Sequence, residues 1–205
     1  MAEAAPKRMD AEARRQQIVD AASACARRFG FHGSSMAEIA QAAALSVGQI
    51  YRYFENKEAI IAAIVARDMA EMRDRYSELK DGGAPFLEAI LTKCSSALDD
   101  LYEADRAALT LEVVAEAARN PKVGAILRAA DAEEREMQHE LFRAVIPAGC
   151  NEAELVARCE VISMLFEGMT MRGVNNPDGD RQAIARVLRS TLRHLLAEPC
   201  GDRVS

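Results

Sequence analysis

The chain lacks tryptophan and is poor in aromatic residues, which make up 5% of its 205 residues. Its five cysteines are scattered and form no C-x-x-C pair, and Arg and Glu interrupt every hydrophobic stretch. No signal peptide or membrane span is therefore expected, and dispersed cysteines in odd number are typical of a protein kept in a reducing compartment. The sequence predicts a soluble protein of the cytoplasm.

Motifs of common enzymes are missing as well, since the chain has no G-x-S-x-G, P-loop or G-x-G-x-x-G. One metal-like spacing occurs, Glu136-x-x-His139, which is the i, i+3 pattern of carboxylate-bridged sites in helix bundles. It occurs once, and only His32 and His194 are left as further histidine ligands. We expect no enzyme activity, no cofactor and no metal. A helical metal- or substrate-binding enzyme, or a redox sensor using Cys150 and Cys159, remains an alternative.

Helix formers dominate what is present. Half of the residues are hydrophobic, and the helix formers Ala, Arg, Glu and Leu are the commonest types. Every segment carries a helical period and none alternates like a strand, so the fold is predicted to be all-α. A mobile tail is expected at residues 1–9 and a break at 81–85. Long helices are expected at 10–29, 56–80, from 86 to about 101, 105–118, 122–146, 151–172 and 180–197.

The charge is distributed unevenly along the chain. The formal net charge is −6, yet residues 1–57 hold eight basic and six acidic side chains, a balance of +2 that leaves −8 for the remainder. A basic end on an acidic body is the asymmetry expected when only that end meets nucleic-acid phosphates.

Two short helices with their own capping signals lie in the basic part. Ser35 with Glu38 fits S-x-x-E and Ser46 with Gln49 fits S-x-x-Q, so each hydroxyl and N3 side chain can satisfy the other residue's free backbone N–H. Between them, residues 42–45 leave room only for a tight turn. This arrangement indicates a helix-turn-helix, whose second helix enters the DNA major groove.

The second helix has an inward pair, Ile50 and Phe54, and an outward set. An amide such as that of Gln49 can bond adenine bidentately, and Val47 fits either contact with a thymine methyl or the core. Tyrosine and lysine suit phosphate contacts that set register, and a hydroxyl at a helix N-terminus offers a phosphate site. The residues predicted to contact DNA are Ser35, Ser46, Val47, Gly48, Gln49, Tyr51, Arg52, Tyr53 and Lys57.

These residues also resemble a known family. The motif Ser46-x-Gly48-x-Ile50-Tyr51-x-Tyr53-Phe54-x-Asn56-Lys57-Glu58, with Ile39-Ala40-x-x-Ala43 and Arg28-Phe29-Gly30-Phe31 upstream, is similar to the DNA-binding domain of TetR-type transcriptional regulators over roughly residues 12–65. The sequence departs from the family at Ala44, where a turn glycine is usual, and at Val47 and Gln49, where many members carry Lys or Thr. We therefore expect a slightly strained turn and an operator preference of its own.

The resemblance implies a three-helix helix-turn-helix domain at residues 10–57 and an all-helical effector-binding and dimerisation domain at residues 58–200. It also implies a ligand-responsive regulator, expected to be a repressor, that binds a palindromic DNA operator as a homodimer. A DNA-binding regulator without any small-molecule effector is a further alternative.

The C-terminal part offers a candidate ligand site, consisting of Met164, Glu167, Met169 and Arg172. Methionine adapts to varied apolar shapes, so these residues fit a pliable pocket, but taken residue by residue an ordinary helix core with charges at its rim is the favoured interpretation. The last two helices also carry a wide apolar stripe, which needs cover from the domain itself or from a second copy of the chain. A second copy is the expectation for Ala183, Ile184, Val187, Leu188, Leu192, Leu195 and Leu196.

Overall fold

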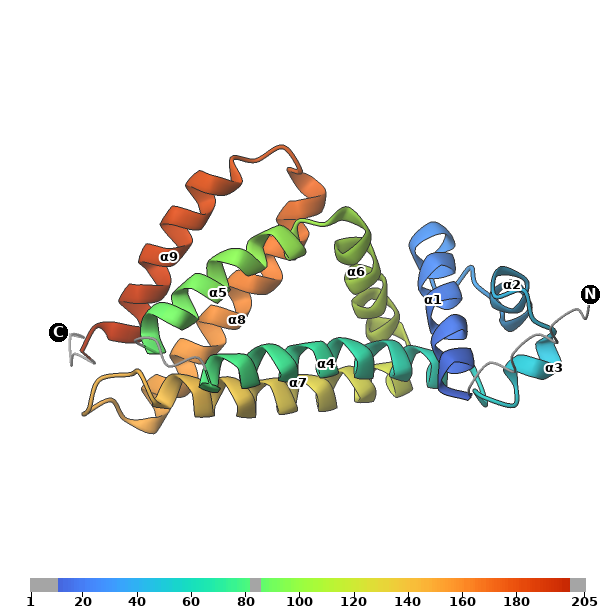
Figure 1. Cartoon of the computed structure of the whole chain (residues 1–205), viewed down its shortest axis with the longest axis horizontal. Coiled ribbons are helices and arrows are strands. Elements are labelled where there is room, and N and C mark those ends of the chain that lie inside the picture. Colours follow the sequence, from blue (N-terminus) through green and yellow to red (C-terminus); the bar gives the residue numbers. More distant parts are fainter. Residues whose placement is uncertain (1–10, 82–85, 200–205) are drawn as a thin grey trace, which may run out of the picture. The chain divides into compact units, whose positions relative to one another are not determined.

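The computed structural model describes residues 11–81 and 86–199 (Figure 1). Within these ranges it contains nine α-helices and no strand, which confirms the all-α prediction. The helices are α1 (Ala11–Phe29), α2 (Met36–Ala42), α3 (Val47–Ile50), α4 (Lys57–Asp81), α5 (Phe86–Leu101), α6 (Ala104–Arg119), α7 (Pro121–Arg143), α8 (Glu152–Asn175) and α9 (Arg181–Ala197).

Helix ends follow the local chemistry of the sequence. Asn151 accepts a hydrogen bond from the Glu154 N–H at 2.9 Å and starts α8, and Asp180 accepts one from the Ala183 N–H at 2.9 Å and starts α9. The largest differences from the predicted bounds are at the ends of α7 and α8, each three residues away. The predicted tail at 1–9 and nearly all of the predicted break at 81–85 lie outside the described residues.

Two compact units divide the chain. The first consists of Met1–Ala66 together with Glu112–Ile126, and the second of Arg67–Leu111 together with Leu127–Ser205. The corner between α6 and α7 therefore belongs with the N-terminal helices. Within the described ranges, no helix is both long enough and apolar enough to cross a membrane.

The first unit places α2 against α1 and α3 against α2 around a small apolar core. Its fully buried large side chains are Ile18, Phe31, Ile39, Ile50, Ile60, Ile61 and Ile64. Ile50 of α3 is 0% exposed and Phe54 is 2% exposed, so both residues point inward as predicted. Burial of side chains of this size stabilises the domain by about 1.5–3 kcal/mol each, which anchors the otherwise short helix α3.

The second unit packs α5 against α9 and α8. Leu188, Leu192 and Leu196 of α9 are 7%, 0% and 0% exposed within their own chain, in a core that includes Ile90 and Leu91 of α5. The prediction that a second copy covers these three leucines is therefore wrong, because α5 already provides their cover. Val187, on the other side of α9, remains 67% exposed.

Candidate nucleic-acid interface

Both predicted capping boxes are present. The Ser35 hydroxyl accepts from the Glu38 N–H at 3.2 Å, and the Glu38 carboxylate accepts from the Ser35 N–H at 2.6 Å. The Ser46 hydroxyl accepts from the Gln49 N–H at 3.2 Å, and Gln49 Oε1 accepts from the Ser46 N–H at 2.8 Å. The Ser35 bonds hold the pKa of Glu38 below its usual value. Each short helix therefore starts at a position fixed by its own cap.

The turn between α2 and α3 depends on a strained residue. Ala44 has φ +52°, which makes it the one non-glycine residue with positive φ among those described. Its Cβ is crowded by backbone in this left-handed conformation, at a cost of about 1–2 kcal/mol. The Leu45 N–H to Ala40 carbonyl bond, 2.9 Å, closes the turn around it. The strain expected from the missing turn glycine is confirmed.

Replacing Ala44 by glycine should therefore stabilise the protein. The expected gain in the free energy of unfolding is about 0.5–1 kcal/mol, because relief of the left-handed strain exceeds the extra freedom that glycine has in the unfolded chain. Urea denaturation of Ala44→Gly measures it. Ala42→Gly, at the last residue of α2 where φ is not positive, is the matched control and should not stabilise the protein. A loss of stability in Ala44→Gly would contradict the strain argument.

The outward face of α3 is open. Gly48, Gln49 and Arg52 are exposed, and a Cβ built on Gly48 meets nothing within 4 Å. Val47 is 38% exposed, so of its two suggested roles the core role does not hold. Tyr51 is 53% exposed. The structure thus brings these predicted residues together on one exposed surface.

The Gln49 side chain also caps α3, in addition to its predicted contact with a base. Its Oε1 already accepts from the Ser46 N–H, which leaves the Nε2 amide protons uncommitted in the α3 cap. Bidentate contact with adenine needs Oε1 as an acceptor for N6 and Nε2 as a donor to N7. Carbonyl oxygen has two lone pairs, so Oε1 can serve the cap and a base together only if the base approaches from the side away from Ser46.

Two of the predicted phosphate contacts also hold the domain together. Lys57 Nζ donates to the Phe31 carbonyl at 2.5 Å, and the Tyr53 carbonyl accepts from Arg15 at 2.8 Å. The Arg15 guanidinium carbon lies 4.4 Å from the centre of the Phe54 ring, a cation–π contact. Sequence reasoning missed Arg15. Its signal was a basic residue on the first helix, but its partners lie 38 residues away.

The proposed ligand residues do not converge. Met164, Glu167 and Arg172 are exposed on α8, whereas Met169 is 8% exposed. Met169 lies instead at an open apolar groove of about 390 Å³, lined by Leu165, Met169, Ala183, Ile184, Val187 and Leu188. The four residues are therefore divided between a solvent-facing side of α8 and the groove that α8 forms with α9.

A polar cluster that the sequence did not reveal lies inside the second unit. Gln138 of α7 is 4% exposed, donates to Glu134 at 3.2 Å and accepts from the Ser163 hydroxyl of α8 at 3.1 Å. It also hydrogen-bonds Tyr76 of α4, whose pKa burial raises above its ordinary value. Burial likewise raises the pKa of Glu134, and it raises the pKa of the Cys94 thiol to about 12. Three helices therefore share one buried hydrogen-bonded network.

The residues named for a metal site or a redox pair have other contacts in the structure. His139 Nε2 lies 2.5 Å from a Glu152 oxygen, and Glu136 is exposed. No three His, Cys, Asp or Glu side chains gather as a metal site within the described ranges. Cys159 is a free, buried thiol with its pKa raised by burial, so the pair of Cys150 and Cys159 suggested by the sequence is not formed.

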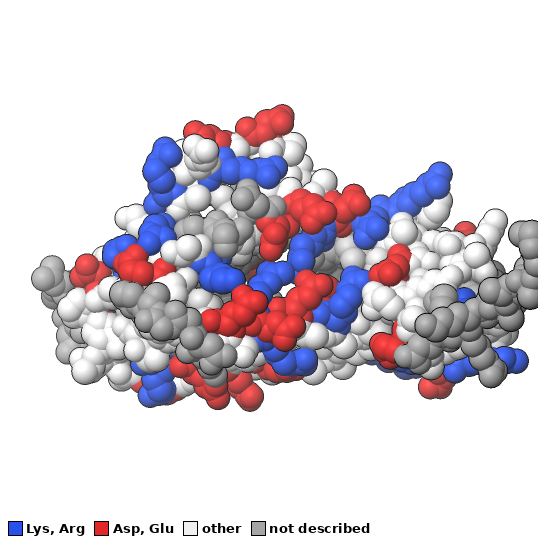
Figure 2. Space-filling view, in the orientation of Figure 1, with Lys and Arg blue, Asp and Glu red and all other residues white. Residues whose placement is uncertain are grey.

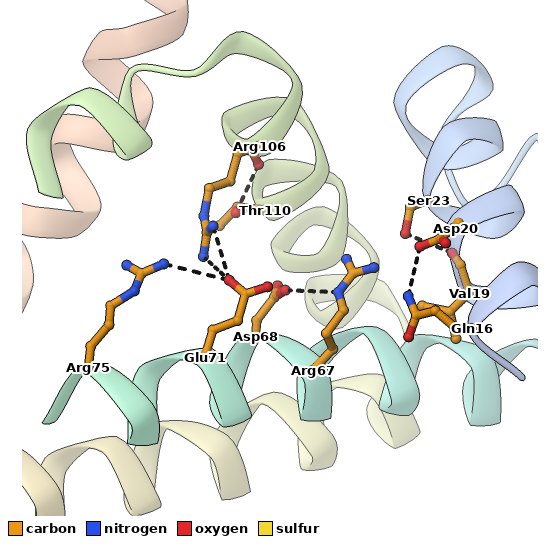
Figure 3. Close-up of polar contacts among 10 residues, drawn as sticks. All are labelled: Gln16, Val19, Asp20, Ser23, Arg67, Asp68, Glu71, Arg75, Arg106 and Thr110. Atoms are coloured by element: carbon orange, nitrogen blue, oxygen red, sulfur yellow. Dashed lines mark hydrogen bonds and ion pairs between the residues drawn. The ribbon is translucent and has the colours of Figure 1, made fainter. Parts of the chain in front are cut away.

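Ion pairs cover much of the second unit. Figure 3 shows Arg106 of α6 donating twice to one oxygen of Glu71 of α4, at 3.2 Å each, with Arg75 3.6 Å from the same oxygen. Burial raises the pKa of neighbouring Asp68. Basic and acidic side chains are interspersed on the face that Figure 2 shows, with no large patch of one sign. Exposed pairs of this kind contribute little stability each, so they serve mainly to fix register between α4 and α6.

Comparison with known proteins agrees with this architecture. Residues 18–64 match the family of bacterial regulatory proteins of the tetR type, and residues 86–197, more than half of the chain, match the C-terminal domain of BetI-type transcriptional repressors. The chain belongs to the TetR family of transcriptional regulators, with a BetI-type C-terminal domain. The resemblance found in the sequence is confirmed, and membership in a family of regulators excludes the enzyme alternative.

Individual relatives are more distant. The chain is 33% identical over 119 residues to the regulator UidR of Escherichia coli K12, an alignment that spans 58% of this chain and 59% of UidR. It is 33% identical over 75 residues to BetI of Klebsiella pneumoniae, spanning 35% of this chain and 38% of BetI. The chain thus covers less than two thirds of these curated relatives.

Solved structures match over more of the length. GusR of Salmonella enterica aligns with a TM-score of 0.74 and 24% identity over 89% of this chain and 95% of its own. FadR of Bacillus subtilis, in complex with stearoyl-CoA, aligns with a TM-score of 0.74 and 22% identity over 88% of this chain and 97% of its own. At these identities the likeness shows a shared fold and nothing about function.

Proposed function

We propose that the protein is a cytoplasmic, ligand-responsive repressor that binds a palindromic DNA operator as a homodimer. The observation that carries the proposal is the pair of capped helices α2 and α3, whose outward side chains are exposed while Ile50 and Phe54 are buried. Family membership agrees with it. We keep residues 10–57 as the DNA-binding domain and residues 58–200 as the effector-binding and dimerisation domain in this proposal.

Within this proposal we assign the predicted DNA contacts two kinds of role. Gln49, Arg52 and the Val47 methyl groups face base edges, and Gly48 lets the helix lie close to them. Ser35, Ser46, Tyr51, Tyr53 and Lys57 lie around that helix and suit phosphate oxygens, which fix register without reading sequence. A dimer reading two half-sites requires them to be spaced about 34–36 Å apart or by a multiple of that distance.

The dimer face that we propose is the exposed apolar side of α8 together with Val187 of α9. This face consists of Val161 (42% exposed), Met164 (57%), Met171 (54%), Val174 (49%) and Val187 (67%). On α8 these positions recur at helical spacing, and Gly168 among them has open space where a Cβ would stand. Large apolar side chains grouped on a surface mark an interaction site, and a two-fold axis lets one face cover its own copy.

We place the effector in the helical body of the second unit. The FadR relative of this fold holds stearoyl-CoA, which shows that the fold accommodates a small molecule. In this chain Met169 and the apolar groove beside it supply adaptable apolar surface. The buried Gln138 network supplies polar groups that could orient a ligand once it enters. Glu167 and Arg172 stand at the rim of α8 in this proposal, whereas Met164 belongs to the proposed dimer face.

Selection of binding sequences from random double-stranded DNA tests the central claim. The expected result is an inverted repeat, and footprinting upstream of the protein's own gene should then locate such a site. Selection of single half-sites, or of none, would overturn the dimeric DNA-binding function. Thermal shift assays with metabolite libraries test the effector, and a regulator without one would show no compound that both raises the melting temperature and releases the operator.

A further inference from the structure

A single residue forms the corner between α6 and α7. The Asn120 N–H donates to the Glu116 carbonyl at 2.8 Å and so completes α6, while the Asn120 carbonyl accepts from the Gly124 N–H at 2.9 Å and so begins α7. Its side-chain Oδ1 accepts from the Lys122 N–H at 3.1 Å. Pro121, the first residue of α7, suits a position whose N–H needs no partner. Asn120 is therefore the end of one helix and the cap of the next.

The same side chain reaches the first turn of α4. Asn120 Nδ2 donates to Glu58 Oε1 at 3.1 Å and to Glu116 Oε1 at 3.4 Å. The pKa of Glu58 lies below its usual value because of its own backbone N–H and, next in size, the Asn120 amide. Glu116 is 7% exposed, so one side of this junction is well shielded from water. The N–H, the carbonyl, Oδ1 and Nδ2 of Asn120 therefore all have hydrogen-bond partners, and all of these partners lie in the first compact unit.

The first turn of α4 is in turn connected to the DNA-facing helices. Asn56 caps α4 through the Ala59 N–H at 2.8 Å, and Lys57 bonds the Phe31 carbonyl between α1 and α2. Only six residues separate the end of α3 from Lys57. The Glu112 carboxylate of α6 also lies close to Gly30 (φ +73°), since a Cβ added there would stand 3.1 Å from its oxygen. The corner thus bonds α4 directly, and α6 passes close to the residue that follows α1.

Helices α6 and α7 continue from this corner to Ala104 and Arg143, in the second unit. We propose that Asn120 is a positioning residue that sets the placement of the DNA-facing helices against the α6–α7 corner through its bond to Glu58. The inference rests on the proposed dimeric function and adds a positioning residue to it, because the corner bonds the first turn of α4, the helix that follows α3 in the chain. Its observable consequence is the selectivity of the dimer for the distance between half-sites.

The variant Asn120→Asp removes the bond to Glu58 together with the weaker one to Glu116. Aspartate keeps the oxygen that caps α7 but has no donor for Glu58, and its charge repels both carboxylates. Asn151→Asp is the matched control, because it makes the same change in the α8 cap, where the side chain accepts from Glu154 N–H. Glu58→Ala removes the bond from the other side and leaves every Asn120 cap intact. Asn120→Asp with Glu58→Gln restores it with donor and acceptor exchanged.

The experiment measures binding of each full-length variant to the selected inverted repeat, to the same repeat with one base pair added or removed, and to a single half-site. We expect wild type and Asn151→Asp to prefer the native spacing strongly. Asn120→Asp and Glu58→Ala should lose about tenfold of that preference at unchanged half-site affinity, and the double variant should regain most of it.

Unchanged spacing preference in folded Asn120→Asp or Glu58→Ala would overturn the inference, and so would an equal loss in Asn151→Asp. A general loss of half-site affinity in parallel with a lowered melting temperature would reduce Asn120 to a structural cap and would also overturn it. If wild type binds the repeat no better than one half-site, the proposed dimeric function fails first, which is a distinct result.

Discussion

Val187→Asp is expected to yield a folded monomer that binds a full operator no better than a single half-site. Val187 is 67% exposed in the chain, so an aspartate there costs the isolated protomer little. In the proposed dimer its carboxylate would be enclosed by apolar surface, at a cost of several kcal/mol unless it finds a partner. Two half-sites assist each other only when a dimer links them and raises the effective concentration of the second reader.

Sedimentation and operator titration measure this result, with two companion variants. Met164→Asp, 57% exposed on α8, tests the same face from the other helix and should act alike. Leu192→Asp, 0% exposed, should instead unfold the chain, because it buries a charge in the α5–α9 core. A dimeric Val187→Asp together with a dimeric Met164→Asp would show that the interface lies elsewhere. A folded, monomeric Leu192→Asp would contradict the burial of that leucine.

Local signals were enough to predict the helices. Each boundary depends on residues within one turn of it, such as Asn151 before α8, Asp180 before α9 and Pro121 at the start of α7. The capping boxes and the strained Ala44 are equally local, because φ, cap and turn are set by neighbours in sequence. The chemistry that starts and stops helices is therefore readable before any fold is known.

Partners across the fold could not be predicted in the same way. A period of 3.6 residues shows that Leu188 and Leu192 need cover but does not say whether α5 or another chain provides it. The same limit applies to Gln138, a polar residue in a charged helix whose partner Ser163 lies 25 residues away. The bond of Asn120 to Glu58, 62 residues distant, likewise gave no sequence signal.

The candidate DNA interface depends both on local signals and on contacts between distant segments. Its outward face follows from the helical period once Ile50 and Phe54 are assigned to the core, and their burial confirms that assignment. The engagement of Lys57 with the Phe31 carbonyl and of Arg15 with Tyr53 was not foreseen, since both depend on how α1 meets the following helices. Long basic side chains can reach many different groups. The sequence therefore predicts where their charge lies along the chain but not which group each one contacts.

Gln49→Ala should weaken operator binding by about 1–3 kcal/mol and relax preference at one base pair, as expected for the loss of a bidentate amide. Alanine also removes the Oε1 that accepts from the Ser46 N–H, so part of any loss would come from a less ordered α3. Gln49→Glu separates the two effects. Glutamate keeps the S-x-x-E capping box but has no amide donor for adenine, and it accepts instead from cytosine.

Gln49→Glu should therefore keep the stability of wild type while its preferred base at that position changes from adenine to cytosine, measured by repeated sequence selection and melting temperature. Lys57→Ala is the contrasting variant. It should weaken binding to all DNA sequences about equally, because a lysine ammonium contacts phosphate rather than a base. The slope of log affinity against log salt concentration should fall by about one, the value of a single phosphate contact. Its loss of the Phe31 bond should show separately, as a lower melting temperature. Equal, sequence-blind losses from Gln49→Ala, Gln49→Glu and Lys57→Ala would mean that Gln49 caps α3 and reads no base.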